Sequence, residues 1–350
     1  MSLIPATILT GFLGSGKTTL LKRVLEEAHG QKIAVIENEF GEENIDSDIL
    51  VSDTQERIIQ MSNGCICCTI RDDLRAALHD LAEKKRKGEL DFERVVIETT
   101  GLADPGPVAQ TFFMDDEIAE SYLLDSILTL VDAKHAGTQL DERQEARRQI
   151  GFADQIFISK TDLVSPDEVT ALMHRLQHMN PRAPQKAVHF GEVALSEVFD
   201  LRGFNLNAKL DIDPDFLKEE EHEHEHEQDH VHGEHCDHPS HQHDGAHHHA
   251  HEDDVKSFVF KSDRAFDPAK LADFLGASVN VYGPRMLRYK GVLYMNGTDR
   301  KVIFQGVHQL MGSDLGPLWG AGETRNSKMV FIGIDLPKDI FLQGMRQCLV

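Results

Sequence analysis

The sequence contains no apolar run that approaches the roughly 18 residues needed to span a membrane. Its N-terminal residues also lack the basic region and the small-residue cleavage site of a signal peptide. Basic residues are scarce, because 36 Lys and Arg stand against 59 Asp and Glu, and the formal net charge is −23. Nucleic-acid phosphates require Lys and Arg to displace their counterions. We therefore expect a cytoplasmic protein with no membrane and no nucleic-acid partner.

The chain of 350 residues is long enough for about two domains, and its 40% hydrophobic content supplies a core of ordinary size. In the N-terminal part, short apolar runs alternate with helical stretches, which predicts an α/β fold with a mostly parallel, doubly wound sheet. The expected strands are 6–10, 33–37, 57–61, 94–99, 126–132 and 155–159, with a weaker one at 186–190. The expected helices are 17–29, 72–84, 143–151 and 165–179.

Residues 219–254 differ in composition, with thirteen Asp or Glu, no Lys or Arg and almost no apolar side chains; the rest of the chain carries a formal charge of −10. Such a stretch cannot bury enough surface to offset its ordering entropy, so we expect disorder when it is metal-free. A small C-terminal α+β domain is expected beyond it, with strands at 256–261, 286–295, 301–307 and 328–335 and helices at 267–275 and from 337. The expected divisions are 1–215, 216–254 and 255–350.

Residues 11–18 match the phosphate-binding pattern G-x-x-x-x-G-K-[ST] between a predicted strand and a predicted helix, which indicates a P-loop NTPase domain. Glycines let backbone N–H groups converge on phosphate oxygens, and the helix N-terminus adds its dipole. Lys17 is expected to reach the β- and γ-phosphates, and the Thr18 hydroxyl to bind Mg²⁺. A chance glycine turn is the alternative, and this context disfavours it. The expected nucleotide-binding residues here are Gly11, Gly14, Ser15, Gly16, Lys17, Thr18 and Thr19.

A second phosphate-side segment, Glu98-Thr99-Thr100-Gly101, ends the predicted strand 94–99. Glu98 is expected on the Mg²⁺ side of the site, and the Gly101 N–H near the γ-phosphate, where it would sense hydrolysis. With Lys17 and Thr18, these two are the expected catalytic residues. The alternative interpretation is a helix cap after a buried strand.

The segment Ser159-Lys160-Thr161-Asp162 indicates which base is bound. Asp162 can accept hydrogen bonds from the ring N–H and the exocyclic amine of guanine, a pair that adenine cannot offer. Lys160 is expected over the base plane. Ser159 stands where Asn or Thr is usual, which predicts a weaker side-chain brace but still favours GTP over ATP. No glutamine occupies an obvious water-orienting position, so we expect slow basal hydrolysis that a partner or a metal accelerates.

Three of the five cysteines lie within four residues, at Cys65, Cys67 and Cys68. In a reducing cytosol, such a cluster indicates metal binding or redox activity rather than a disulfide framework. Three thiolates can converge on one tetrahedral ion, and soft ligands select Zn²⁺ or Cu⁺. The alternatives are three small buried thiols and a thiol-redox role.

The acidic segment Glu37-Asn38-Glu39-Phe40-Gly41-Glu42 lies where a first switch would form. One of its carboxylates would supply a fourth, exchangeable metal ligand, and Glu37 and Glu42 are our candidates. Such a ligand would tie metal occupancy to the nucleotide state.

Thirteen of the twenty histidines lie between His222 and His251. Neutral imidazoles bind Zn, Cu, Ni and Co, so we interpret the tract as a low-specificity metal reservoir that feeds the cysteine site. A solvated acidic linker is the alternative. Cys236 adds a candidate ligand there, whereas we expect Cys348 to be inert.

Together, the P-loop, the segments 37–41, 64–68 and 98–105, and Ser159–Asp162 resemble those of the CobW-like family of P-loop GTPases. The resemblance covers the chain apart from the His-rich insertion. It implies that Cys65, Cys67 and Cys68 carry Zn²⁺, and that GTP hydrolysis drives transfer of the ion to a client metalloprotein. The C-terminal module would face the client, and a homodimer is a further option. The competing hypothesis is a passive metal buffer with a secondary nucleotide site.

Overall fold

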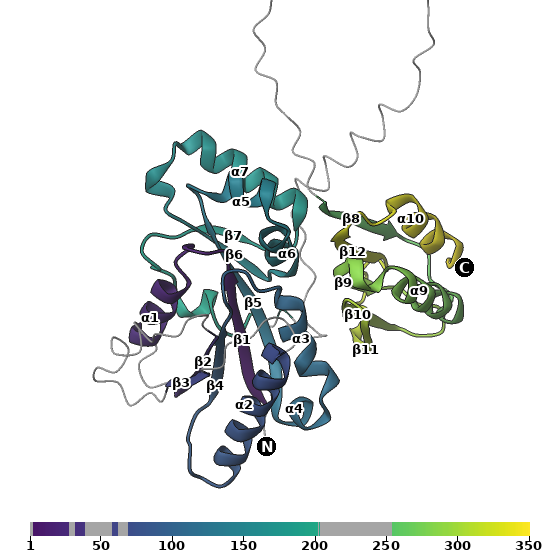
Figure 1. Ribbon diagram of the computed structural model, residues 1–350. Coiled ribbons are helices and arrows are strands. Elements are labelled where there is room, and N and C mark those ends of the chain that lie inside the picture. Colours follow the sequence, from purple (N-terminus) through teal and green to yellow (C-terminus); the bar gives the residue numbers. More distant parts are fainter. Residues whose placement is uncertain (1–2, 28–31, 39–57, 62–68, 202, 204–253) are drawn as a thin grey trace, which may run out of the picture.

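The computed structural model describes residues 3–27, 32–38, 58–61, 69–201, 203 and 254–350. The described chain forms two β-sheets, each with its own helices (Figure 1). Within these residues, no helix is both long and apolar enough to cross a membrane. The predicted disordered tract and its boundaries fall largely outside the described residues and remain predictions.

The N-terminal sheet has seven strands in the order β3-β2-β4-β1-β5-β6-β7, and every pairing is parallel. The strands are β1 Ile4–Gly11, β2 Ile33–Asn38, β3 Ile58–Met61, β4 Arg94–Glu98, β5 Tyr122–Asp132, β6 Gln155–Ser159 and β7 Gln185–Ala187. Adjacent residues of β1 enter opposite cores: Ile8 packs with α2 and α3, and Leu9 packs with α1. The predicted doubly wound α/β sheet is therefore confirmed.

The helices of this domain are α1 Lys17–Glu27, α2 Thr69–Arg86, α3 Pro105–Met114, α4 Asp116–Ser121, α5 Ala136–Glu142, α6 Gln144–Phe152 and α7 Pro166–Met179. The sequence predicted α1, α2, α6 and α7 but missed α3, α4 and α5. The last two are short, with 6 and 7 residues, so their apolar pattern is brief. The expected strand at 186–190 is wrong in its second half, because Phe190 and Gly191 adopt left-handed backbone conformations that leave β7.

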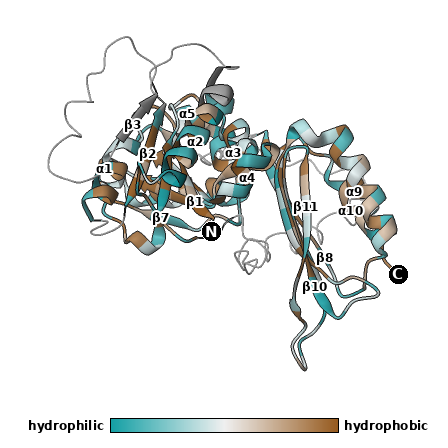
Figure 2. Ribbon diagram, turned by 90° about the horizontal axis from the view of Figure 1, so that it is seen from below, coloured by the Kyte–Doolittle hydropathy of each residue, from teal (hydrophilic) through white to brown (hydrophobic). Residues whose placement is uncertain are grey.

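The C-terminal sheet is antiparallel, in the order β11-β10-β9-β12-β8. Its elements are β8 Val255–Ser262, α9 Pro268–Tyr282, β9 Met286–Leu293, β10 Arg300–Val307, β11 Leu310–Leu318, β12 Ser327–Ile334 and α10 Lys338–Gln347. Figure 2 shows α9 and α10 side by side along this sheet. The sequence missed β11, an edge strand that carries Gly312, Gly316 and Pro317, residues that disfavour a strand interior.

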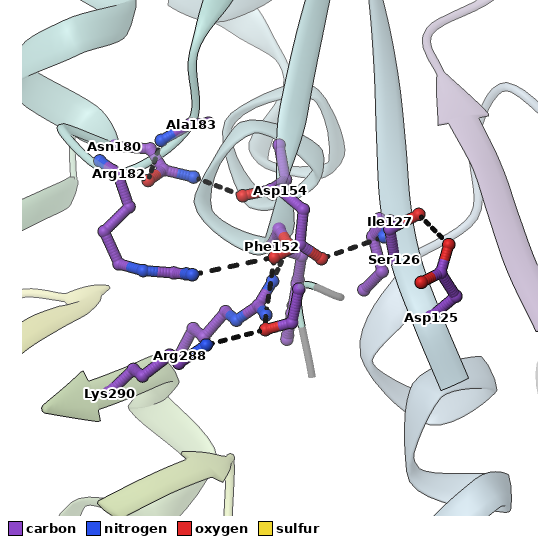
Figure 3. Close-up of polar contacts among 12 residues, drawn as sticks. Asp125, Ser126, Ile127, Phe152, Asp154, Asn180, Arg182, Ala183, Arg288 and Lys290 are labelled. Atoms are coloured by element: carbon purple, nitrogen blue, oxygen red, sulfur yellow. Dashed lines mark hydrogen bonds and ion pairs between the residues drawn. The ribbon is translucent and has the colours of Figure 1, made fainter. Parts of the chain in front are cut away.

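The two sheets share apolar packing, because Leu287 and Ile332 of the C-terminal sheet belong to the same buried cluster as Ile150 of α6. Polar contacts surround this packing (Figure 3). The Arg288 guanidinium donates to the Phe152 carbonyl at 2.9 Å and lies 2.7 Å from an Asp154 carboxylate oxygen. The close contact with α6 fixes the C-terminal domain against a helix of the N-terminal domain.

Lys290 lies beside Arg288 in this contact region (Figure 3). The guanidiniums of Arg182 and Arg288 and the carboxylate of Asp154 are its charged neighbours. Its Nζ donates to the Gly203 carbonyl at 3.2 Å. Burial, reinforced by the two guanidiniums, lowers the pKa of Lys290 to about 7. The ammonium is therefore close to deprotonation at neutral pH.

Candidate nucleotide and metal site

The predicted nucleotide-site segments all follow parallel strands, and the structure brings them to one edge of the sheet. The P-loop follows β1, the Gly101 segment follows β4, and Lys160 follows β6. Ligands of open α/β sheets bind outside the carboxyl ends of the strands. This edge is therefore the candidate site.

The glycines of the P-loop occupy backbone conformations that other residues rarely adopt, with φ of +143° at Gly11, +73° at Gly14 and +98° at Gly16. A Cβ at Gly11 would clash with the Leu130 carbonyl oxygen. The loop then leads directly into α1 at Lys17. Backbone N–H groups at the start of a helix form an anion site, as the predicted phosphate cradle requires.

The Lys17 side chain is buried within this loop, with 8% of its surface exposed. Its Nζ donates to the Gly11 carbonyl at 2.8 Å and to the Phe12 carbonyl at 3.3 Å. Burial lowers the pKa of the ammonium, and the Glu98 carboxylate opposes that shift. The cation therefore lies against the loop that is predicted to hold the phosphates.

The Thr18 hydroxyl donates to a Glu98 carboxylate oxygen at 3.0 Å, so the two predicted Mg²⁺-side residues are in direct contact. A hydroxyl and a carboxylate are the hard oxygen donors that Mg²⁺ prefers. Thr19 is exposed one position further along α1. The buried hydroxyls of Ser15 and Thr100 have no hydrogen-bond partner among the described residues. Such groups fit a site that a nucleotide and its cation complete.

Gly101 packs directly on the P-loop, because a Cβ there would lie 2.6 Å from the Leu13 backbone nitrogen. The Thr99 hydroxyl also donates to the Thr10 hydroxyl at 2.9 Å. Gln149 of α6, which the sequence did not reveal as a site residue, donates its side-chain amide to the carbonyls of Gly101 at 3.1 Å and Ala103 at 3.0 Å. A glutamine within a helix carries no sequence signal for this contact, which joins residues 48 positions apart.

The base-side segment begins at Ser159, where the sequence predicts a weaker side-chain brace. The Ser159 hydroxyl donates to the Ser15 carbonyl at 2.7 Å and lies 3.3 Å from the Val131 carbonyl. The serine hydroxyl therefore reaches the P-loop from the end of β6, and the expected weakening of the brace stays a prediction. Asp162, in the short 3₁₀ turn Thr161–Leu163, leaves about half of its side chain exposed, available to a base.

Lys160 has a left-handed backbone, with φ of +57°, which directs its chain back over the P-loop. Its Nζ donates to the Gly14 carbonyl at 2.8 Å and to Asp132 at 2.7 Å. Burial alone would raise the pKa of Asp132, but hydrogen bonds from Lys160 and His135 outweigh it and lower the pKa. Asp132, the last residue of β5, is a second site residue that the sequence did not reveal.

The predicted metal ligands are only partly described. Cys65, Cys67, Cys68 and Glu42 lie outside the described residues, in gaps bounded by β2, β3 and α2. Glu37 is described, and it pairs in register with Glu98 of β4. Neighbouring strands lie about 4.8 Å apart, so Glu37 belongs to the same sheet edge as the Mg²⁺-side residues. Within the described part of the chain, no group of three His, Cys, Asp or Glu could hold a metal ion.

Comparisons with known proteins agree with this geometry. The family model of the CobW/HypB/UreG nucleotide-binding domain matches residues 5–186, and that of the cobalamin synthesis protein CobW C-terminal domain matches residues 255–349. The zinc chaperone YjiA of Escherichia coli K12 is 39% identical over 339 residues, which cover 97% of this chain and 96% of YjiA. The zinc chaperone CobW of a Sinorhizobium species is 30% identical, covering 95% of this chain and 93% of that protein.

Solved structures give the same result. The crystal structure of zinc-bound YjiA GTPase from E. coli aligns over 100% of both chains, with a TM-score of 0.75 and 33% identity. A zinc-bound triple mutant of YjiA, in which one glutamate and two cysteines are replaced by alanine, aligns with a TM-score of 0.76 and 33% identity over 100% of both chains.

Proposed function

Because the chain belongs to the CobW/HypB/UreG family, we propose that it is a GTP-hydrolysing metallochaperone that binds Zn²⁺ through Cys65, Cys67 and Cys68 and transfers it to a client metalloprotein. The observation that carries the proposal is the register of Glu37 with Glu98, which links a candidate zinc ligand to the Mg²⁺ side of the nucleotide site. The relatives named as zinc chaperones support zinc as the cargo.

In this proposal the P-loop N–H groups and Lys17 hold the β- and γ-phosphates, and Asp162 reads guanine. Thr18 and Glu98 hold Mg²⁺, which neutralises charge that develops on the phosphate oxygens. The Gly101 N–H senses the γ-phosphate. Gln149 uses its amide group on two backbone carbonyls rather than on an attacking water, which supports slow basal hydrolysis.

Metal transfer depends on a ligand that changes with the nucleotide. Glu37 lies beside Glu98, one residue before the end of β2, and the sequence continues into the predicted first switch with Glu42. A carboxylate from this segment completes the site formed by the three thiolates in one nucleotide state and leaves it in the other. Linkage requires that zinc changes nucleotide affinity by the same factor by which nucleotide changes zinc affinity.

In the proposed metal transfer, the histidine tract captures the ion for the cysteine site, because thirteen imidazoles among acidic side chains attract divalent cations. It is also the observation that favours the second candidate, a passive metal buffer. The triple mutant of YjiA still binds zinc without one glutamate and two cysteines. An experiment on this chain must therefore separate the cysteine motif from the tract.

The test measures zinc affinity by competition with a chromophoric chelator, in the apo, GDP and non-hydrolysable GTP analogue states. It uses the full chain, Cys67→Ala, and a chain without residues 219–254. Cys348→Ala is the matched control, because that thiol is 3% exposed in the C-terminal core and donates to the Gly344 carbonyl at 3.1 Å.

We expect the Kd for zinc to differ at least about fivefold between nucleotide states, which is the lower range of measured coupling. The difference should persist in Cys348→Ala and in the chain without the tract, and vanish in Cys67→Ala. Equal zinc affinity in all three nucleotide states would contradict the coupled chaperone and leave a metal buffer. The capture role predicts that the cysteines load zinc more slowly in the chain without the tract. Equal loading rates in that chain and in the full chain would contradict it.

A further inference from the structure

His308, in the turn between β10 and β11, contacts the nucleotide-binding domain through its ring. A Cβ at Gly106, in the first turn of α3, would lie 2.6 Å from His308 Nε2. The ring centroid lies 5.2 Å from that of Phe152 at the end of α6, in an edge-on arrangement. The ring therefore packs against Gly106 and Phe152, in a space that exists only because residue 106 has no side chain. We call this space the His308 socket.

The backbone of His308 is held in an unfavourable conformation for a residue with a side chain. Its φ is +52°, in the left-handed region, while its N–H donates to the Met286 carbonyl at 3.0 Å. His308 and Gln309 form the two-residue turn between the paired residues Val307 and Leu310, and such hairpin turns require positive φ, so the strand pairing fixes where the ring points. Burial lowers the pKa of His308, which favours the neutral ring, and the Asp104 carboxylate opposes that shift.

The socket is joined by hydrogen bonds to the segment 101–104. Asp104 caps α3 by accepting from the Gly106 N–H at 2.9 Å, and Arg148 of α6 donates to the same carboxylate at 2.7 Å. The next residue of α6, Gln149, is 1% exposed and holds two carbonyls of the segment. The first turn of α3, the middle of α6 and the segment 101–104 therefore form one connected unit.

We propose that His308 is a positioning residue for the segment 101–104, so that the seating of the C-terminal domain sets how strongly the nucleotide site distinguishes GTP from GDP. This inference rests on the proposed function, in which Gly101 senses the γ-phosphate. Linkage makes this coupling reciprocal. The free energy by which domain seating alters nucleotide preference equals the free energy by which the nucleotide alters domain seating. A client bound to that domain would thereby respond to hydrolysis.

Two variants perturb the contact from opposite sides. His308→Gly removes the ring and suits the left-handed backbone, whereas Gly106→Ala pushes a methyl group into the ring. Gly137→Ala is the matched control, because Gly137 is also the second residue of a helix, α5, and a Cβ added there would meet nothing within 4 Å. The readout is the ratio of the Kd for GDP to the Kd for a non-hydrolysable GTP analogue, measured on full chains.

We expect each of the two variants to change this ratio at least threefold, and Gly137→Ala to leave it within twofold. Gly106→Ala should have a smaller effect in the His308→Gly background, because the methyl group then meets only the Phe152 ring and no longer the imidazole. A merely structural contact would lower thermal stability or weaken both nucleotides equally, and an unchanged ratio in both variants would overturn the inference.

Gly101→Ala keeps the backbone N–H but should displace it, because the added Cβ would lie 2.6 Å from the Leu13 nitrogen, and so it tests the γ-phosphate sensing of the proposed function separately from His308. If Gly101→Ala changes the ratio of the two nucleotide Kd values while His308→Gly and Gly106→Ala leave it unchanged, only the role of His308 is contradicted. If Gly101→Ala also leaves the ratio unchanged, γ-phosphate sensing by Gly101 fails and the inference falls with it.

Discussion

Thr18 and Glu98 are separated by 80 positions in the sequence, yet the Thr18 hydroxyl donates to the Glu98 carboxylate at 3.0 Å. The contact forms because β1 and β4 are adjacent parallel strands, with Leu9 in register with Glu98. Parallel strands end at the same edge of a sheet, so two oxygen donors from distant segments meet there. The contact between the two proposed Mg²⁺ ligands is thus a consequence of strand order.

Replacing Glu98 with Gln should lower the Mg²⁺-dependent GTPase rate at least about tenfold, because the neutral amide stabilises the cation less. The measurement is the rate as a function of Mg²⁺ concentration, with the midpoint moving to higher concentration. Glu93→Gln is the control, since that exposed residue precedes the opposite end of β4. An unchanged Mg²⁺ midpoint in Glu98→Gln would remove this residue from the metal site.

Asp162→Asn should exchange the base preference of the site. In the proposed role the carboxylate would accept two hydrogen bonds from guanine, whereas an asparagine amide donates and suits the second carbonyl of xanthine. We expect GTP affinity to fall about 100-fold and XTP to bind more tightly than GTP, by competition against a fluorescent nucleotide. Asp167→Asn, in the exposed first turn of α7, should change neither affinity. If Asp162→Asn still prefers GTP, another residue reads the base.

Ser159→Ala should weaken GTP binding about fivefold, because it removes the hydrogen bond to the Ser15 carbonyl and such bonds contribute about 1 kcal/mol. Ser159→Thr keeps the hydroxyl and should bind GTP as the native chain does. Nucleotide titration of the two variants checks this expectation. Equal affinities for the alanine and threonine variants would show that the brace is not needed.

Lys290 should make the free energy of unfolding rise with pH. The pKa is lowered to about 7 in the folded chain, from an ordinary value of 10.5, so between these values only the unfolded chain keeps the proton. Raising the pH then favours the folded state, by about 2 kcal/mol between pH 7 and pH 9. Below pH 7 both states are protonated and the destabilisation is fully present.

The check is denaturant unfolding of the native chain and Lys290→Met at pH 7, 8 and 9. The difference in unfolding free energy between the two should change by that amount across the range. Lys256→Met, at an exposed position of β8, is the control. Its unfolding free energy should change with pH as that of the native chain does. Parallel curves for Lys290→Met would mean that Lys290 stays charged in the fold.

Much of the nucleotide site was predictable because its chemistry is local in sequence. The P-loop needs its glycines, lysine and threonine in eight consecutive residues, and the structure has the three glycines in left-handed or extended positive-φ loop positions, with Lys17 and Thr18 beginning α1. The resemblance to the CobW-like family is confirmed by the family models and by the YjiA structure. The helices α3, α4 and α5 escaped prediction, because α3 is apolar along most of its length and the other two are short.

The sequence by itself determined the alternating α/β pattern and the glycine-rich loop before α1, because backbone conformation is set by neighbouring residues, and it predicted Asp162 as the guanine reader. Only the tertiary structure decided that Ser159 braces Ser15, that Gln149 holds the Gly101 segment, and that His308 reaches Gly106. These contacts join segments far apart in the chain, and their distances depend on strand order and on how α6 packs between the two sheets. No local pattern encodes them.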